Sequence, residues 1–185
     1  MCHSTKPHYG AKSLLLATLA ASSAIGCHGQ GDGQSAPSQT GLGAGTCADP
    51  IFLQPSAPLT GQSTADATNV VSGDDPTCLG YATHGGERVY KVMVPATGST
   101  KLHLEVTPDQ SPSAEAFDPV IYLSEMCSAN PVCVAGQDTH GGGGGESLDF
   151  VNTSGEEKSL YVVVDGYDFQ LNGGAYTLMA TLAAP

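Results

Sequence analysis

The chain has 185 residues, of which 18 are Asp or Glu and 6 are Lys or Arg, so its formal net charge at pH 7 is −12. Such an acidic surface repels phosphate backbones and anionic lipid headgroups, which disfavours nucleic-acid binding and electrostatic docking on a membrane. The charge fits a solvated, soluble surface, and binding of divalent cations is the sharper alternative.

The N-terminal residues are typical of an export signal. Lys6 and Lys12 precede an apolar run, residues 13–25, that ends in small residues and is shorter than the about 20 residues a membrane-spanning helix needs. The sequence Ala-Ile-Gly-Cys, which ends at Cys27, resembles a bacterial lipobox, and ordinary signal peptidase would cut at the same bond. We therefore expect residues 1–26 to be a lipoprotein signal peptide and an acyl lipid such as palmitate to anchor Cys27 in a membrane.

The cysteine count supports this interpretation. Of the six cysteines, Cys2 leaves with the signal peptide and Cys27 carries the lipid. The remaining even number suits two disulfides in an oxidising compartment, formed by Cys47, Cys78, Cys127 and Cys133. Three pairings are possible. The segment between Cys127 and Cys133 is short and turn-prone, which predicts a Cys127–Cys133 bridge and leaves Cys47 to pair with Cys78.

The mature chain divides into a tether and one domain. Loss of the two leader lysines leaves 4 basic and 18 acidic residues, or 4 − 18 = −14. Residues 27–46 are rich in Gly, Ser and Pro and bury too little apolar surface to fold, so we expect a disordered, flexible tether. Residues 47–185 have a length that suits a single domain with one core.

Short strands with alternating apolar residues recur through that domain. Tyr90, Val92 and Val94 share one face of an extended segment, as do Leu102, Leu104 and Val106 in the next. Gly, Pro, Asp, Ser and Asn separate the expected strands, which span residues 88–94, 101–106, 118–126, 131–136 and 147–152 and two further runs within 158–182. The number and spacing of these strands favour an all-β fold, an antiparallel, jelly-roll-like β-sandwich.

The two runs within residues 158–182 predict a hairpin. Each run alternates, and a polar turn that ends in Gly173 and Gly174 separates them. Because a hairpin alone is marginally stable in water, the earlier strands must supply a second layer against its apolar face.

A set of motifs in this domain resembles a known family. The sequence FDPVIYL at residues 117–123 is followed by YVVVDGY at 161–167 and by GAYTL at 174–178. In this order they resemble the bacterial pre-peptidase C-terminal domain, with a likeness that covers roughly residues 61–182. The resemblance implies a β-sandwich of the kind usually appended to secreted proteases, and related collagenase modules bind collagen with help from calcium. Without an attached protease domain, we expect an accessory module on a tether.

Motifs for catalysis and for phosphate binding are missing from the sequence. The five glycines at residues 141–145 are followed by Glu146 rather than by Lys-Ser or Lys-Thr, which favours a strand connection over a phosphate loop. Neither GxSxG nor HExxH occurs. His84 and His140 have glutamates nearby and could bind a transition metal, or they are surface loop residues. We expect no enzyme activity.

Two pairs of residues near the last turn are candidate sites. Asp165 and Asp168 could hold calcium, or their side chains bond the turn backbone. No other cofactor is indicated. Tyr167 and Phe169 could present a contact surface to a polymer or protein, or they cap the core.

The sequence therefore predicts a non-enzymatic, lipid-anchored protein of the bacterial cell envelope. Its partners would be the membrane, through the lipid, and an unknown extracytoplasmic protein or polymer. The alternative is an accessory module of a secreted protease system. A third hypothesis, an enzyme, would require Ser, His or acidic groups that converge in one concave site.

Overall fold

The computed structural model describes residues 43–75, 77–96, 100–109, 116–167 and 173–184. The chain separates into two units, Met1–Ala36 and Pro37–Pro185, and every described residue belongs to the second. The predicted signal peptide, Cys27, Asp168 and Phe169 lie outside these residues, as does the predicted tether up to residue 42. Within the described part, no helix has the length and apolar character needed to cross a bilayer.

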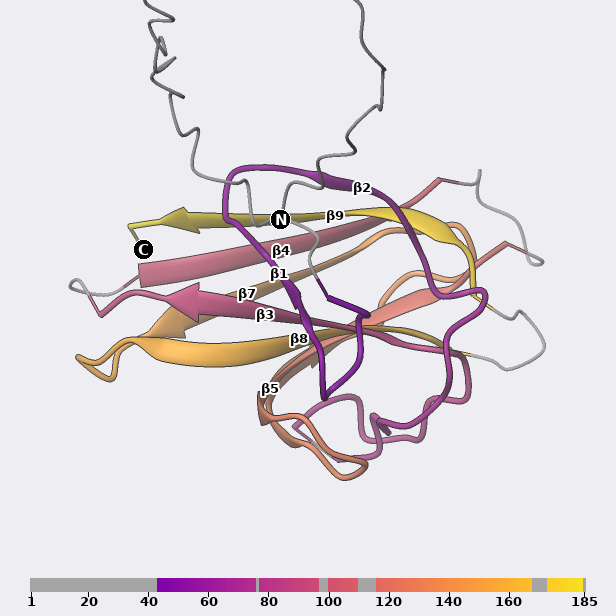
Figure 1. The fold of residues 1–185 in the computed structure, drawn as a ribbon, viewed down its shortest axis with the longest axis horizontal. Coiled ribbons are helices and arrows are strands. Elements are labelled where there is room, and N and C mark those ends of the chain that lie inside the picture. Colours follow the sequence, from indigo (N-terminus) through magenta and orange to yellow (C-terminus); the bar gives the residue numbers. More distant parts are fainter. Residues whose placement is uncertain (1–42, 76, 97–99, 110–115, 168–172, 185) are drawn as a thin grey trace, which may run out of the picture. The chain divides into compact units, whose positions relative to one another are not determined.

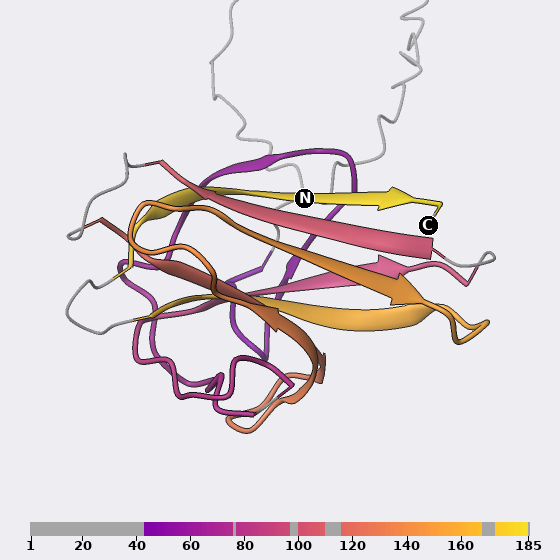
Figure 2. The ribbon, with the colours of Figure 1, turned by 180° about the vertical axis from the view of Figure 1, so that it is seen from behind.

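The described residues form two sheets and no α-helix (Figures 1 and 2). The strands are β1 (Ile51–Phe52), β2 (Leu59–Ser63), β3 (Arg88–Val94), β4 (Thr100–Pro108), β5 (Pro119–Met126), β6 (Val132–Gln137), β7 (Glu146–Asn152), β8 (Lys158–Gly166) and β9 (Ala175–Ala183). One sheet has the order β1-β3-β8-β5-β6 and the other the order β2-β9-β4-β7. Every pairing is antiparallel except that of β1 with β3. The predicted β-sandwich is confirmed.

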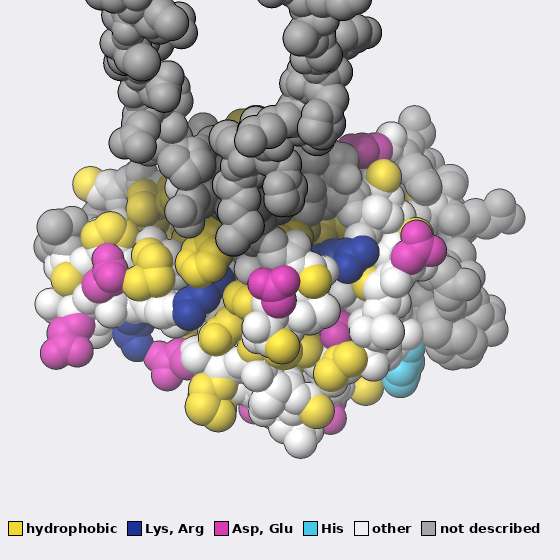
Figure 3. Space-filling view, viewed as in Figure 1, with side chains coloured by type: hydrophobic (Ala, Val, Ile, Leu, Met, Phe, Trp, Pro, Cys, Tyr) yellow, Lys and Arg dark blue, Asp and Glu magenta, His cyan; other side chains and the backbone are white. Residues whose placement is uncertain are grey.

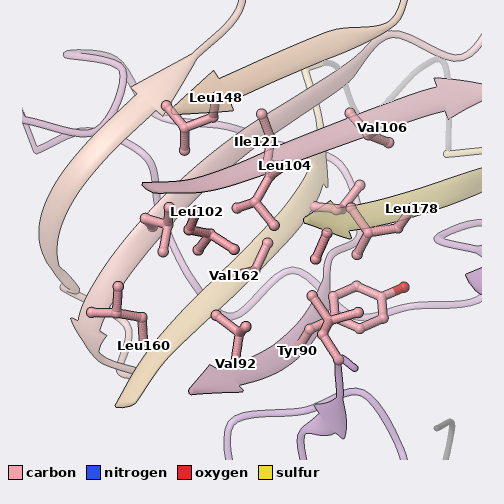
Figure 4. Close-up of a cluster of buried hydrophobic side chains, with 14 of the residues drawn as sticks. Tyr90, Val92, Leu102, Leu104, Val106, Ile121, Leu148, Leu160, Val162 and Leu178 are labelled. Carbon is pink, nitrogen blue, oxygen red and sulfur yellow. The ribbon is translucent and has the colours of Figure 1, made fainter. Parts of the chain in front are cut away.

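The main core lies between the two sheets. The alternating residues expected to face inward do so: Val92 and Val94 on β3 and Leu102 and Leu104 on β4 are almost completely buried. Figure 4 shows side chains from both sheets, such as Val162 of β8 and Leu178 of β9, that point into this shared interior. The core also encloses two polar atoms, the hydroxyl oxygens of Tyr90 and Tyr176, which hydrogen-bond each other at 2.5 Å.

The predicted hairpin between the last two strands is wrong. β8 lies between β3 and β5 in the five-stranded sheet, whereas β9 lies between β2 and β4 in the four-stranded sheet. The apolar faces of β8 and β9 therefore oppose each other across the core instead of lying side by side in one sheet. A polar turn between two alternating strands also allows a crossover between sheets, so the local pattern did not specify the partner strands.

A second buried cluster lies on the outer face of the five-stranded sheet. Residues 64–75 and 77–87, between β2 and β3, cover this face and are called the outer layer below (Figure 1). The cluster consists of sheet residues and outer-layer residues, with further packing from Leu79 and Tyr161: Val71, Cys78, Val89, Val120, Tyr122, Cys133 and Val163. None of the described outer-layer residues is in a helix or strand.

The four cysteines form two disulfides, but the predicted pairing is wrong. Cys47 is bonded to Cys127 and Cys78 to Cys133, each with a Cα–Cα distance of 5.3 Å. Cys127 and Cys133 do not face each other, because register shifts in the β5–β6 pair place Cys133 opposite Ser124. Cys127 lies beyond the end of β5. The first bridge thus ties the residue after β5 to the start of the domain, and the second ties β6 to the outer layer.

Candidate functional site

Strand ends bring two tyrosines and two aspartates together at one end of the sandwich. Asp118 directly precedes β5 and Asp138 directly follows β6, and these strands are antiparallel neighbours. Tyr167 directly follows β8, whose residue Gly166 pairs with the first residue of β5. Tyr81 comes from the outer layer. We call these four residues the aromatic–acidic surface.

Direct contacts hold this surface together. The rings of Tyr81 and Tyr167 meet edge to face, with centroids 5.8 Å apart and an interplanar angle of 74°. The Tyr81 hydroxyl donates a hydrogen bond to Oδ2 of Asp138. The backbone N–H of Tyr167 donates to the carbonyl of Asp118 at 3.0 Å. Tyr167 remains 48% exposed, so its ring does not cap the core and is accessible to a partner.

The carboxylates of this surface lie close enough to repel each other. Burial, together with the negative charges of Asp138 and Glu146, raises the pKa of Asp118 to about 6. Burial also raises the pKa of Asp138, partly offset by the hydrogen bond from Tyr81. Oδ1 of Asp118 is buried and has no hydrogen-bond partner among the described residues. This end of the molecule therefore has a surplus of negative charge and an acceptor without a donor.

The described basic side chains are engaged elsewhere. Lys101 pairs with Asp149 and Lys158 pairs with Glu125. Two others complete the set of described lysines and arginines: Arg88 donates to the carbonyls of Ser63 and Ala44, and Lys91 lies over the ring of Tyr161. In the view of Figure 3, too, basic side chains are few. None of these contacts supplies a counter-ion to the aromatic–acidic surface.

The glycine-rich segment folds around a buried carboxylate. Glu146 accepts hydrogen bonds from the backbone N–H groups of Thr139 and His140, at 2.9 and 2.6 Å, and Gly143 donates to the carbonyl of Phe117. These contacts fit the expected strand connection, and the buried negative charge of Glu146 beside the glycines would repel a phosphate. Nδ1 of His140 lies 3.3 Å from Glu146. Across the described residues, no group of three or more His, Cys, Asp or Glu is placed to hold a metal ion, so His84 and His140 gain no support as ligands.

Asp165, one of the two predicted calcium ligands, is completely buried. Its carboxylate accepts hydrogen bonds from the Thr83 hydroxyl, from the Tyr122 hydroxyl at 3.2 Å and from the Gly166 N–H at 2.7 Å. Burial and the nearby charge of Glu87 raise its pKa to about 7. Asp168, the other member of the predicted pair, lies outside the described residues, so calcium binding stays a prediction. The visible role of Asp165 is to bond the outer layer to β8.

Glu87 plays a related part in the outer layer. Its carboxylate accepts hydrogen bonds from the N–H groups of Val70, at 2.9 and 3.0 Å, and Val71, at 3.2 Å. Burial raises its pKa. The two carboxylates thus satisfy donors of a segment that has no strand partner of its own.

The contacts among the described residues reveal no complete set of catalytic groups. Nδ1 of His103 lies 2.6 Å from Asp149, but both side chains are more than a third exposed, on the outer face of the four-stranded sheet. The hydroxyl of Ser124 is engaged with the carbonyls of Met126 and Val132. A cavity of about 250 Å³ has no Ser or His in its lining, which consists of Gly45, Thr46, Cys47, Ala48, Ala67, Thr68, Val70, Glu87 and Arg88.

The sequence pattern pointed to Tyr167 but not to Tyr81 or Asp138. The sequence did contain a signal for Asp138. An acidic residue stands at the start of the expected strand 118–126 and another shortly after the end of the expected strand 131–136, and these two ends meet when the strands are antiparallel. Tyr81 had no such signal, since it lies in a segment without strand periodicity whose position depends on distant contacts. Phe169 lies outside the described residues.

The chain resembles solved structures at low sequence identity. No family model matches the chain, and no curated protein matches it. One similar structure is the pre-peptidase C-terminal domain of collagenase from Bacillus anthracis, 15% identical, which covers 70% of this chain and 92% of its own with a TM-score of 0.42. The CBM35 from Cellvibrio japonicus Abf62 is 12% identical and covers 68% of this chain and 93% of its own, with a TM-score of 0.31.

A third similar structure belongs to a family GH115 4-O-methyl-α-glucuronidase with specificity for decorated arabinogalactans. It is 13% identical, covers 72% of this chain but only 18% of that enzyme, and has a TM-score of 0.31. The predicted pre-peptidase C-terminal domain is thus found among the similar structures, at low identity, and membership of that family stays a prediction.

Proposed function

We propose that the mature chain is a non-enzymatic, lipid-anchored binding protein of the bacterial cell envelope, and that its aromatic–acidic surface binds a positively charged segment of another envelope protein. The observation that carries this proposal is the combination of a half-exposed Tyr167 with carboxylates that have no Lys or Arg partner among the described residues.

The chemistry of this surface favours a cationic ligand. A Lys or Arg side chain gains from the face of an aromatic ring and from a charge-assisted hydrogen bond to a carboxylate. Its charge would also offset the repulsion that Asp138 and Glu146 exert on Asp118. A neutral polysaccharide could pack on Tyr167 but would leave that repulsion in place, and an anionic polymer would add to it.

Binding of a fluorescent hexalysine peptide to the full-length protein at physiological salt tests the proposal. Tyr167→Ala and Asp138→Asn should each weaken binding by roughly tenfold, the effect of removing one partly exposed cation contact. Matched controls are Phe52→Ala, which removes an exposed aromatic ring elsewhere, and Glu157→Gln, which removes an exposed charge elsewhere. Both should bind like the unaltered protein.

Two outcomes would contradict this ligand class. Equal losses in Glu157→Gln and Asp138→Asn would show that hexalysine responds only to net charge. Binding of neutral cellohexaose that depends on Tyr167, without hexalysine binding, would make the ligand a saccharide instead.

The lipid anchor follows from the proposed export signal and from the acidity of the mature chain. A net charge of −14 (4 − 18) provides no electrostatic attraction to anionic headgroups, so membrane attachment needs the acyl group. Cys27→Ser should therefore move the protein from the membrane fraction to the soluble fraction of cell lysates. A folded Cys27→Ser protein that still sediments with membranes would refute lipidation as the anchor.

A further inference from the structure

Two neighbouring side-chain contacts connect the outer layer to the end of β8. Tyr81 and Thr83, two residues apart in the outer layer, contact Tyr167 and Asp165, which are two residues apart at the end of β8. The first contact is the exposed ring pair, and the second is a hydrogen bond between side chains that are at most 2% exposed. A buried polar contact thus lies next to the partly exposed aromatic one along the strand end.

The backbones also approach closely at this point. The N–H of Gly85 donates to the carbonyl of Gly166 at 2.9 Å. A Cβ atom on Gly85 would lie 2.5 Å from the Cα of Gly166, so no larger residue fits without a backbone shift. Residues 81–85 are therefore held against the end of β8, but this backbone contact alone leaves the direction of the Tyr81 side chain open.

The buried contact has little freedom to rearrange. Around the Asp165 carboxylate lie the Thr83 and Tyr122 hydroxyls, the Gly166 N–H and, as a second acidic group, Glu87. A buried acceptor that loses a donor is destabilised, and water does not reach Asp165 to replace it. Thr83 is consequently fixed relative to β8, and with it the residues on either side.

We propose that the buried hydrogen bond from Thr83 to Asp165 is a positioning contact that holds the Tyr81 ring against Tyr167 and thereby maintains the aromatic–acidic surface. For ligand binding, the proposal rests on the function proposed above. Tyr81 keeps its own bond to Asp138, so loss of the buried contact should widen the range of ring positions without detaching the residue. Asp165 thus affects the surface without being part of it.

Thr83→Val tests the proposal because it removes the hydroxyl and keeps the shape of the side chain, whereas Thr83→Ser retains the hydroxyl. The control Thr64→Val removes another buried threonine hydroxyl, which accepts a hydrogen bond from the Gly174 N–H. The first readout is the nuclear Overhauser effect between the Tyr81 and Tyr167 rings in the full-length protein. The second is the dissociation constant for hexalysine, and urea unfolding shows that each variant is folded.

We expect Thr83→Val to lose the nuclear Overhauser effect between the Tyr81 and Tyr167 rings. It should also bind hexalysine roughly fivefold more weakly, which corresponds to the loss of one hydrogen bond. Thr83→Ser should restore both, and Thr64→Val should keep both at a comparable stability. Retention of the ring contact in folded Thr83→Val, its loss in Thr83→Ser, or an equal loss in Thr64→Val would overturn the proposal. If the unaltered protein does not bind hexalysine, the proposed ligand fails, while the ring contact still decides the positioning role.

Discussion

The core between the two sheets and the cluster beneath the outer layer are equally buried but differ in composition. The first is filled mainly by aliphatic side chains that alternate along regular strands. The second combines a few apolar residues with two disulfides and the buried carboxylates of Glu87 and Asp165. The difference reflects the backbone, because the N–H groups of paired strands bond the carbonyls of neighbouring strands. An irregular segment instead needs side-chain acceptors for its N–H groups and covalent bonds to hold its position.

This difference predicts two modes of opening. Hydrophobic burial between the sheets involves both sheets at once, so its loss should unfold the whole domain. The outer layer should open on its own, because its directional contacts can break while the two sheets stay packed.

Removal of the Cys78–Cys133 disulfide should lower the stability more than the single substitutions below. Because this bridge joins residues 55 positions apart, the chain-entropy model gives a loss of about 4 kcal/mol in the free energy of unfolding when both cysteines are replaced by Ser. Urea unfolding measures that loss. Hydrogen exchange should show early opening at Val70 and Val71 while amides of β4 and β8 stay protected.

Two results would contradict this prediction. Simultaneous loss of protection in β4 and β8 would show that the outer layer is not a separate unit. Peptide mapping of the non-reduced protein that joined Cys127 to Cys133 would contradict the pairing itself.

A matched pair of valines compares the two regions directly. Val162 lies in the main core and Val71 beneath the outer layer, and both are completely buried. Val162→Ala should lower the free energy of global unfolding by about 2 kcal/mol, from lost burial and the remaining cavity. Val71→Ala should mainly accelerate hydrogen exchange in the outer layer. Equal effects on global unfolding would remove the distinction between the regions.

Sequence patterns were informative where structure is periodic. Alternation correctly placed Val92 and Leu104 in the core, because side-chain direction along a strand is a local property. It did not reveal that β8 and β9 belong to different sheets, because both arrangements bury the same faces. Strand partners are determined by long-range packing, which alternation does not encode.

The outer layer and the candidate site were harder to predict for the same reason. The predicted disulfide pairing was wrong because it relied on the short distance along the chain between Cys127 and Cys133. In the structure, register shifts between β5 and β6 accompany a bond from Cys133 to Cys78. Tyr167 could be identified from its place beside a strand end. Tyr81 could not, because only the folded outer layer brings it there.

The predicted effect of a change of one pH unit is smaller than either loss above and separates the two regions by their chemistry. The pKa of Asp165 is raised from 3.8 to about 7, first by burial and then by the charge of Glu87, with hydrogen bonds from Thr83, Gly166 and Tyr122 acting in the opposite direction. Between about pH 4 and 7 the folded state therefore holds a proton that the unfolded state has lost. The free energy of unfolding should fall as pH rises through that window, by roughly 1 kcal/mol per pH unit, and this contribution should be constant above it.

Asp165→Asn removes the titration and keeps the size of the side chain, so the fall in stability between pH 4 and 7 should become shallower. The matched control is Asp149→Asn on the outer face of the four-stranded sheet, where the pKa of Asp149 is lowered by hydrogen bonds from His103 and Lys101. That variant should retain the fall. Urea unfolding at intervals from pH 4 to 8 measures both, and an unchanged slope in Asp165→Asn would mean that the buried carboxyl does not link protonation to the stability of the outer layer. A flattened slope accompanied by slower exchange at the Gly166 amide above pH 7 would locate the linkage at the contact between β8 and the outer layer, because the described residues of the main core include no Asp, Glu or His.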